Sequence, residues 1–158
     1  MKKWTILLLL LAVAVGAQAQ FEKGKKFVGA SLSGLGLSYS SSERFRMGID
    51  AEAGYFVADS WLIKANVGYE HTRYTDDVRV GLMARYYITQ NGLSIGAGAE
   101  YDHFTPKNND VMIPVELGYT FFLNEFITIE PAVYYKMSLH DFSNNSTVGV
   151  RIGFGYYF

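Results

Sequence analysis

The sequence predicts an all-β fold, an eight-stranded antiparallel up-and-down transmembrane β-barrel. The final segment, residues 147–158, alternates without error between an apolar face and a face of small, polar or charged residues. Eight alternating segments follow one another along the chain, and tight turns alternate with longer polar loops between them. An apolar side toward lipid and a polar side toward a filled interior is the pattern of a barrel that spans a membrane.

The alternation places each expected strand in chain order, with lengths of about 11 to 14 residues where a tilted membrane strand needs roughly 9–11. The strands cover residues 27–39, 45–57, 61–73, 78–88, 93–104, 111–123, 126–139 and 147–158. Tight turns are expected at 58–60, 89–92 and 124–125, and longer polar loops at 40–44, 74–77, 105–110 and 140–146. Short turns at one end and longer loops at the other are typical of membrane barrels.

From the second to the seventh strand, the residues assigned to the lipid side carry no formal charge, as in Ile49, Val67 and Leu82. An arginine or lysine at the bilayer midplane would cost about 2–4 kcal/mol, which gives this avoidance a physical cause. Aromatic residues near both ends of the strands are expected to form two interfacial girdles, an upper one with Tyr69, Tyr101 and Tyr135 and a lower one with Tyr55, Trp61 and Phe158.

Two irregular features are expected within this pattern. Pro114 and Pro131 fall inside expected strands, and because proline has no N–H to donate to a ladder, we expect a bulge or a local distortion at each. In the first strand the outward positions change from even-numbered to odd-numbered residues near Ser33 and Gly34, which a glycine bulge would explain.

Residues 1–19 have the pattern of a secretory signal peptide, with two early lysines, an apolar run and an Ala-Gln-Ala cleavage box. Cleavage is expected before Gln20, which leaves residues 20–158 as a single barrel domain with 12 basic and 15 acidic residues, a net charge of −3. This balance provides no basic arm for nucleic acid. The absence of cysteine excludes disulfides and thiolate chemistry.

The parity that clears the lipid side of charge places six basic and seven acidic residues in the interior. An eight-stranded barrel is just wide enough for side chains to fill it, so these groups are expected to pair with one another. The near balance of sign favours such a filled lumen over a selective pore, which usually displays rings of one charge, although a small-ion path through the network remains an alternative. The interior network comprises Arg46, Asp50, Glu52, Lys64, Glu70, Arg79, Arg85, Glu100, Asp102, Glu116, Glu130, Lys136 and Arg151.

In strand number, loop alternation, polar interior and terminal phenylalanine, residues 21–158 resemble the small outer-membrane barrels of the OmpA transmembrane domain and OmpX type. The resemblance implies that Ile152, Phe154, Tyr156 and Phe158 form the terminal signal read by the barrel-assembly machinery. It implies periplasmic chaperones and that machinery as partners, contact with outer-membrane lipid and lipopolysaccharide, and a monomer. The leader ending in Ala-Gln-Ala-Gln is similar to those of Bacteroidetes outer-membrane proteins.

One segment is similar to a known enzymatic element. Residues 140–144, His-Asp-Phe-Ser-Asn, resemble the His-x-Ser-Asn element of outer-membrane lipid A deacylases. Here His140 and Ser143 stand three apart instead of two, so on a continuous strand they would point to opposite faces and could not share a proton. We therefore expect no catalytic residues.

Metal sites are also not expected. Two histidines end the tripeptides 69–71 and 101–103, each after an acid, but parity turns each histidine outward and its neighbouring carboxylate inward. Asp76, Asp77 and Asp110 could touch calcium or other cations, yet solvated loop acids are the simpler interpretation. No cofactor is expected.

Together these patterns predict an integral outer-membrane barrel with a side-chain-filled lumen and a structural or cell-surface interaction role. The alternative is a small-solute or ion channel, and a lipid-modifying outer-membrane enzyme is less favoured. A fold of this kind hosts several functions, so it does not choose among them.

Overall fold

A computed structural model describes residues 21–33, 46–72, 76–88, 92–104, 108–140 and 146–158. The described chain is almost entirely strand. The strands are β1 (Lys26–Ser33), β2 (Arg46–Ala58), β3 (Trp61–Thr72), β4 (Asp76–Tyr87), β5 (Leu93–Phe104), β6 (Asn108–Tyr119), β7 (Phe121–Phe122), β8 (Ile127–Ser138) and β9 (Thr147–Tyr157). Within these ranges there is no helix long and apolar enough to cross a membrane.

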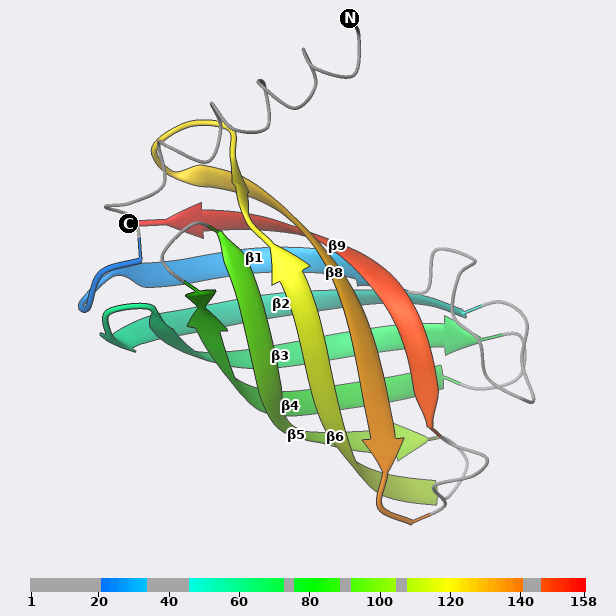
Figure 1. The fold of residues 1–158 in the computed structure, drawn as a ribbon. Coiled ribbons are helices and arrows are strands. Elements are labelled where there is room, and N and C mark those ends of the chain that lie inside the picture. Colours follow the sequence, from blue (N-terminus) through cyan, green and yellow to red (C-terminus); the bar gives the residue numbers. More distant parts are fainter. Residues whose placement is uncertain (1–20, 34–45, 73–75, 89–91, 105–107, 141–145) are drawn as a thin grey trace, which may run out of the picture.

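The strands form one closed antiparallel barrel (Figure 1). From β1 to β6 each strand pairs with the next, β6 and β7 both pair with β8, β8 pairs with β9, and β9 pairs with β1 from Phe27↔Tyr157 to Ser33↔Arg151. Because β6 and β7 pair in succession with the same neighbour, they occupy one position, and the barrel has the eight positions that the sequence predicts. The predicted fold class is confirmed. We call the end with the β2–β3 turn and the C-terminus the turn end, and the opposite end the loop end.

Both prolines interrupt pairing without shifting its register. Between β5 and β6 the pairing stops at Ala97↔Val115 and resumes at Glu100↔Met112 in the same register, and Pro114 lies in the gap. Pro131 faces the break between β6 and β7. The expected distortion is therefore present at each proline, but in these strands it is not a bulge. The predicted single strand over 111–123 is wrong, because it divides at Thr120.

Two predicted loops end earlier than expected, because the strands that follow them, β4 and β6, begin earlier. The pairs Glu70↔Asp77 and Asp102↔Asp110 extend the ladders, so both aspartates lie in strands. A register shift near Phe56 in the β2–β3 ladder was not predicted. The parity change expected at residues 33–34 extends outside the described residues.

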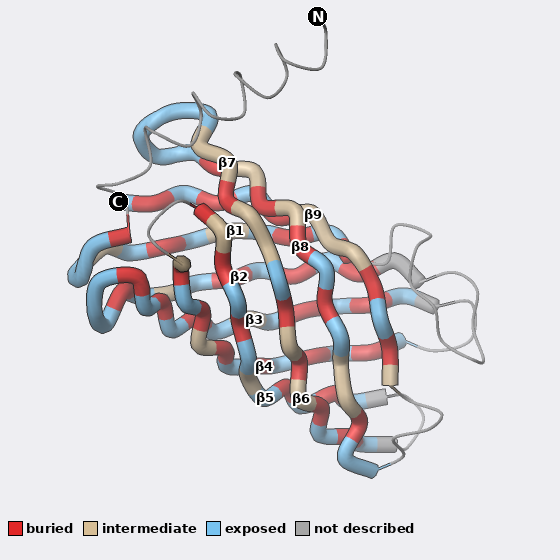
Figure 2. Tube along the Cα trace, viewed as in Figure 1, coloured by how far each residue is buried: buried red, intermediate tan, exposed pale blue. Residues whose placement is uncertain are grey.

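Burial alternates along each strand, and it is the reverse of that in a water-soluble protein (Figure 2). The outer side carries Val67, Leu82 and Val133, which are 56%, 62% and 53% exposed. The inner side carries Lys64 and Arg85, which are 1% and 3% exposed. The tyrosines and the tryptophan assigned to the two girdles also lie on the outer side.

Candidate functional site

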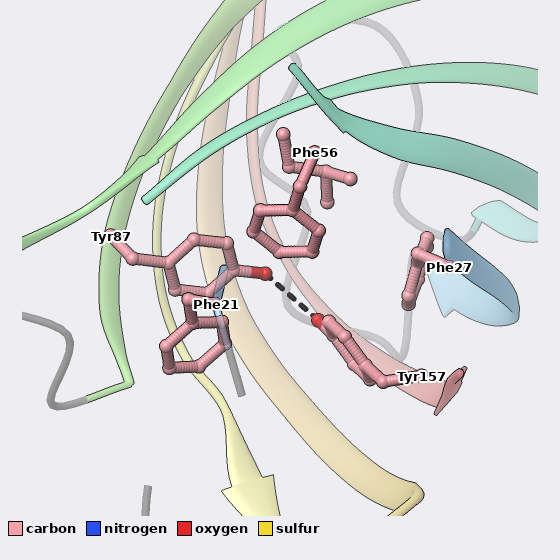
Figure 3. Packing of buried hydrophobic residues seen from close by; sticks show 6 residues of the cluster. Phe21, Phe27, Phe56, Tyr87 and Tyr157 are labelled. Atoms are coloured by element: carbon pink, nitrogen blue, oxygen red, sulfur yellow. Dashed lines mark hydrogen bonds between the residues drawn. The ribbon is translucent and has the colours of Figure 1, made fainter. Parts of the chain in front are cut away.

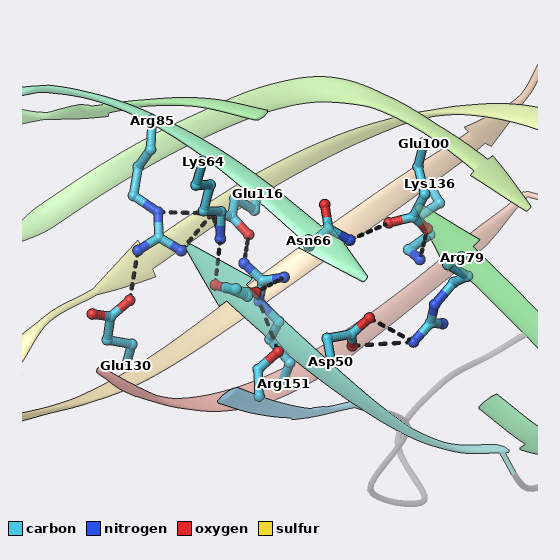
Figure 4. A network of polar contacts seen from close by, with 12 residues as sticks. Asp50, Lys64, Asn66, Arg79, Arg85, Glu100, Glu116, Glu130, Lys136 and Arg151 are labelled. Carbon is cyan, nitrogen blue, oxygen red and sulfur yellow. Dashed lines mark hydrogen bonds and ion pairs between the residues drawn. The ribbon is translucent and has the colours of Figure 1, made fainter. Parts of the chain in front are cut away.

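The lumen is the candidate site, because the alternation of the strands brings charged side chains from β2 to β6, β8 and β9 into a narrow interior. Its inward residues form two groups, one toward the turn end and one toward the loop end (Figure 4). The turn-side group consists of Glu52, Lys64, Arg85, Glu116, Glu130 and Arg151. The loop-side group consists of Asp50, Glu70, Asp77, Arg79, Glu100, Asp102, Asp110 and Lys136.

Glu116 on β6 is the centre of the turn-side group and is 2% exposed. Arg85 donates from Nε to its Oε1 at 2.9 Å, and Lys64 Nζ lies 3.5 Å from the same oxygen. Arg151 donates to its other oxygen. Three cations from β3, β4 and β9 thus meet one carboxylate across the lumen, which only a narrow barrel allows.

Two further carboxylates complete the turn-side group. Lys64 Nζ lies 3.0 Å from Oε2 of Glu52. Arg85 donates from Nη1 to Glu130 at 2.5 Å. The group therefore balances three acids with three bases. Such buried pairs stabilise only when their partners remain in place, because an isolated buried charge bears its full desolvation cost.

Arg79 joins two acids of the loop-side group. Its Nη2 donates to Asp50 at 3.0 and 3.1 Å, and its Nη1 donates to Glu70. Nearby, Glu100 accepts hydrogen bonds from Lys136 and, at 3.2 Å, from Nδ2 of Asn66.

Asp77 and Asp110 are lumen residues that the sequence interpretation missed. Each is 4% exposed, as is Asp102, and Asp110 accepts a hydrogen bond from Oγ of Ser138 at 2.5 Å. The expectation that Asp77 and Asp110 are solvated loop acids is therefore wrong. The signal was present, since both residues share the inward alternation of their strands, but the predicted strands began one residue after each of them.

These additions change the predicted charge balance. Among the described residues the lumen carries nine acids and five bases, and the acidic excess lies entirely in the loop-side group. Arg46 begins β2, but its side chain is outside what the structure describes. The other twelve residues of the expected network point into the barrel.

Among the described residues, the lumen contains two small hollows of about 20 Å³ each. One lies against Glu70 and Asp102, the other against Asn66, and Tyr134 and Lys136 line both. Because about 10–15 Å³ suffices for one water molecule, each hollow has room for about one. Hollows of this size do not make an open path for a solute.

An aromatic cluster closes the turn end beneath the ion pairs (Figure 3). It contains Phe21, Phe27, Phe56, Leu62, Tyr87 and Tyr157, all at most 2% exposed. The hydroxyls of the two tyrosines are 2.8 Å apart, and that of Tyr157 donates to Glu130 at 2.6 Å. The phenols therefore join the apolar cluster to the turn-side ion pairs.

Phe21 was missed because it precedes the first strand, where alternation carries no information. The sequence leaves it outside the first expected strand, and the structure places it in the cluster. Its position depends on contacts between segments far apart in the chain.

The proposed terminal signal lies on the outer face of β9 and at its end. Phe154, Tyr156 and Phe158 are 49%, 43% and 48% exposed, and Ile152 is partly buried. The ring of Phe126 stacks on that of Tyr156 with centroids 5.7 Å apart. These residues form an apolar stripe at the turn end, directed away from the lumen.

The histidines do not form a site together. His71 Nδ1 lies 2.7 Å from Asp76, His103 Nδ1 lies 2.6 Å from Asn109, and all four side chains are on the exposed side. His140 is exposed, and Ser143 is outside the described residues. In the part of the chain that the structure describes, no group of three or more potential ligands could hold a metal ion.

A family model described as "Domain of unknown function (DUF2715)" matches residues 5–158. A search of curated proteins finds no match. Solved structures with the same fold include the N-terminal β-barrel domain of Pseudomonas aeruginosa OprF, with 15% identity, a TM-score of 0.69 and coverage of 86% of this chain and 98% of that one. Outer membrane protein OprG from Pseudomonas aeruginosa has 14% identity and a TM-score of 0.55, with coverage of 88% and 98%.

Ail, the attachment invasion locus protein of Yersinia pestis, has 12% identity and a TM-score of 0.53, with coverage of 86% of this chain and 99% of that one. Because the sequence identities to these three structures are so low, the comparisons show similarity of fold alone. It confirms the resemblance to small outer-membrane barrels. Nothing in the comparisons supports the Bacteroidetes resemblance of the leader, which stays a prediction.

Proposed function

The chain belongs to the family described as Domain of unknown function (DUF2715), and from its geometry we propose that it is an integral outer-membrane barrel with a closed, side-chain-filled lumen and a structural or cell-surface interaction role. One observation carries the proposal. Charged groups such as Lys64 and Glu116 are almost fully buried, while Leu82 and Val67 are more than half exposed. This inversion is favourable only where the surroundings are apolar.

The same proposal assigns the export route and the partners. The leader at residues 1–19 directs export, and the outward stripe ending at Phe158 is read by the barrel-assembly machinery after transport by periplasmic chaperones. The apolar belt then contacts outer-membrane lipid and lipopolysaccharide. The protein acts as a monomer with no cofactor and no catalytic residue.

The alternative function is a small-ion path, and one observation favours it. Among the described residues, the loop-side group contains six carboxylates and two cations, which would attract cations to that end of the lumen. Against it, the turn-side ion pairs and the aromatic cluster fill the lumen below. A closed barrel therefore remains the better explanation.

Electrophoresis and conductance together test the proposal. The chain from Gln20 is refolded into detergent, boiled and unboiled samples are compared on a denaturing gel, and the folded protein is added to a planar bilayer. We expect a heat-modifiable band and no discrete conductance. Heat-modifiability with stable conductance would favour the ion path, and a soluble protein without a heat-modifiable band would refute the membrane assignment.

A further inference from the structure

The five residues before β1 fold across the turn end of the barrel and place one aromatic ring inside it. Phe21 is 0% exposed, whereas Glu22, Lys23 and Gly24 are on the surface. The segment therefore enters the barrel with a single side chain while its backbone stays at the rim.

The pocket around Phe21 is made of other rings. Its ring stacks on that of Tyr87, with centroids 3.9 Å apart and an interplanar angle of 16°. It meets Tyr157 edge-on at 6.1 Å (Figure 3). It also meets Phe122 edge-on at 5.5 Å. The two edge-to-face contacts have the geometry that aromatic pairs favour, and with the stacked ring of Tyr87 they make a pocket that suits a flat apolar ring.

Backbone hydrogen bonds fasten this segment to the β2–β3 turn. Ser60 N donates to Phe21 O at 2.7 Å, and Ser60 O accepts from Tyr87 N at 2.9 Å. Ser60 has a φ of 66°, a left-handed conformation unusual for serine, and this turn connects the segment to the strand that carries the stacked ring. Lys23 N donates to Asp59 Oδ1 at 2.9 Å.

The ring lies next to the polar groups that end the ion-pair network. Arg85 donates to the hydroxyl of Tyr87 at 3.2 Å, and the hydroxyl of Tyr157 donates to Glu130. Phe21 contacts the rings of both tyrosines. Removing its side chain would leave a cavity on the route from the turn end to these charges.

We propose that the turn end of the barrel is a pocket for one aromatic ring, which the chain fills with its own Phe21 as a removable stopper. The stopper keeps water and small ions from reaching Glu130 and Arg85 from that end. The ligand class of the emptied pocket is a small apolar aromatic molecule, because the rings that enclose it already stack on and edge-pack against one flat ring.

A single introduced thiol can report access to the network. Thr128 is 0% exposed, and its hydroxyl donates to Glu130 at 3.0 Å. The chain has no cysteine, so Thr128→Cys supplies the only thiol. Its rate of reaction with a small charged methanethiosulfonate is measured in the refolded barrel with and without Phe21→Ala.

We expect labelling at least about tenfold faster with Phe21→Ala and unchanged with the matched control Phe126→Ala, an aromatic residue at the same end that is 43% exposed. Added toluene should slow the labelling of the Phe21→Ala barrel and leave the control unaffected. Equal rates with and without the ring, or no effect of toluene, would overturn the proposal.

A second variant covers the case in which Phe21→Ala does not fold. Phe21→Leu keeps most of the volume and should give an intermediate labelling rate. If neither variant shows a heat-modifiable band while Phe126→Ala does, the ring is part of the folding core and not a removable stopper. That result would refute this proposal and leave the membrane-barrel proposal intact.

Discussion

Replacing Leu82 by arginine tests the proposed lipid-facing belt directly. Leu82 lies midway along β4, is 62% exposed and pairs with Ala65 and Ala99 on the neighbouring strands. A charge at the centre of a lipid-facing strand costs about 2–4 kcal/mol. Since each 1.4 kcal/mol is a factor of ten, the folding equilibrium should fall by roughly 30- to 700-fold.

Leu123 provides a matched control. It is also a leucine that is 62% exposed, but it lies in the β7–β8 connection at the turn end. Leu123→Arg should cost about 0–1 kcal/mol, because the penalty falls toward the interface. The assay is urea unfolding of each variant in lipid vesicles, followed by the fraction that keeps the heat-modifiable band. Equal effects at the two positions would refute the reasoning. In a protein surrounded by water, two equally exposed leucines would both accept arginine with almost no loss of stability.

Three further substitutions test the interior. Glu116→Gln should destabilise the barrel by about 3–5 kcal/mol in urea unfolding, because it leaves three buried cations without their shared carboxylate; a loss below about 1 kcal/mol would contradict this ion-pair network. Tyr87→Phe should cost about 1–2 kcal/mol by the same measurement, because it removes a buried hydroxyl that is hydrogen-bonded at 2.8 and 3.2 Å. Gly98→Ala should reduce refolding yield, since the added Cβ would lie 2.2 Å from a backbone oxygen of β4. The control Gly153→Ala should refold normally, because the nearest atom to its added Cβ would be 3.4 Å away. Equal yields of the two variants would contradict the close approach of β5 to β4.

Alternation predicts the lipid side well because that side obeys one rule, the exclusion of charge. Leu82 and Val67 could be assigned outward, and Lys64 and Glu116 inward, from parity alone. Parity also determines which residues share a lumen once the number of strands is known. The fold class and most of the candidate site therefore follow from local pattern.

The remaining features depend on contacts between strands, which parity does not encode. Asp77 and Asp110 resemble loop residues until the ladder pairs opposite them extend their strands. The break at Thr120 reflects Pro131 on the facing strand, together with the hydrogen bond from Thr120 N to Gly92 O at 2.9 Å. Phe21 has no strand pattern at all. Each error thus arises where a distant residue determines the local structure.

The order of the layers along the barrel explains how one narrow lumen can be both charged and closed. An acidic excess at the loop end would by itself draw cations inward, but the balanced pairs around Glu116 offer no net charge to continue the path. Below them, the phenols of Tyr87 and Tyr157 satisfy the last charged groups, and apolar rings follow. Hydrogen bonds of these phenols join the polar layer to the apolar one. A conducting state would have to disrupt both layers, so neutralising one charge should destabilise the barrel before it opens the lumen.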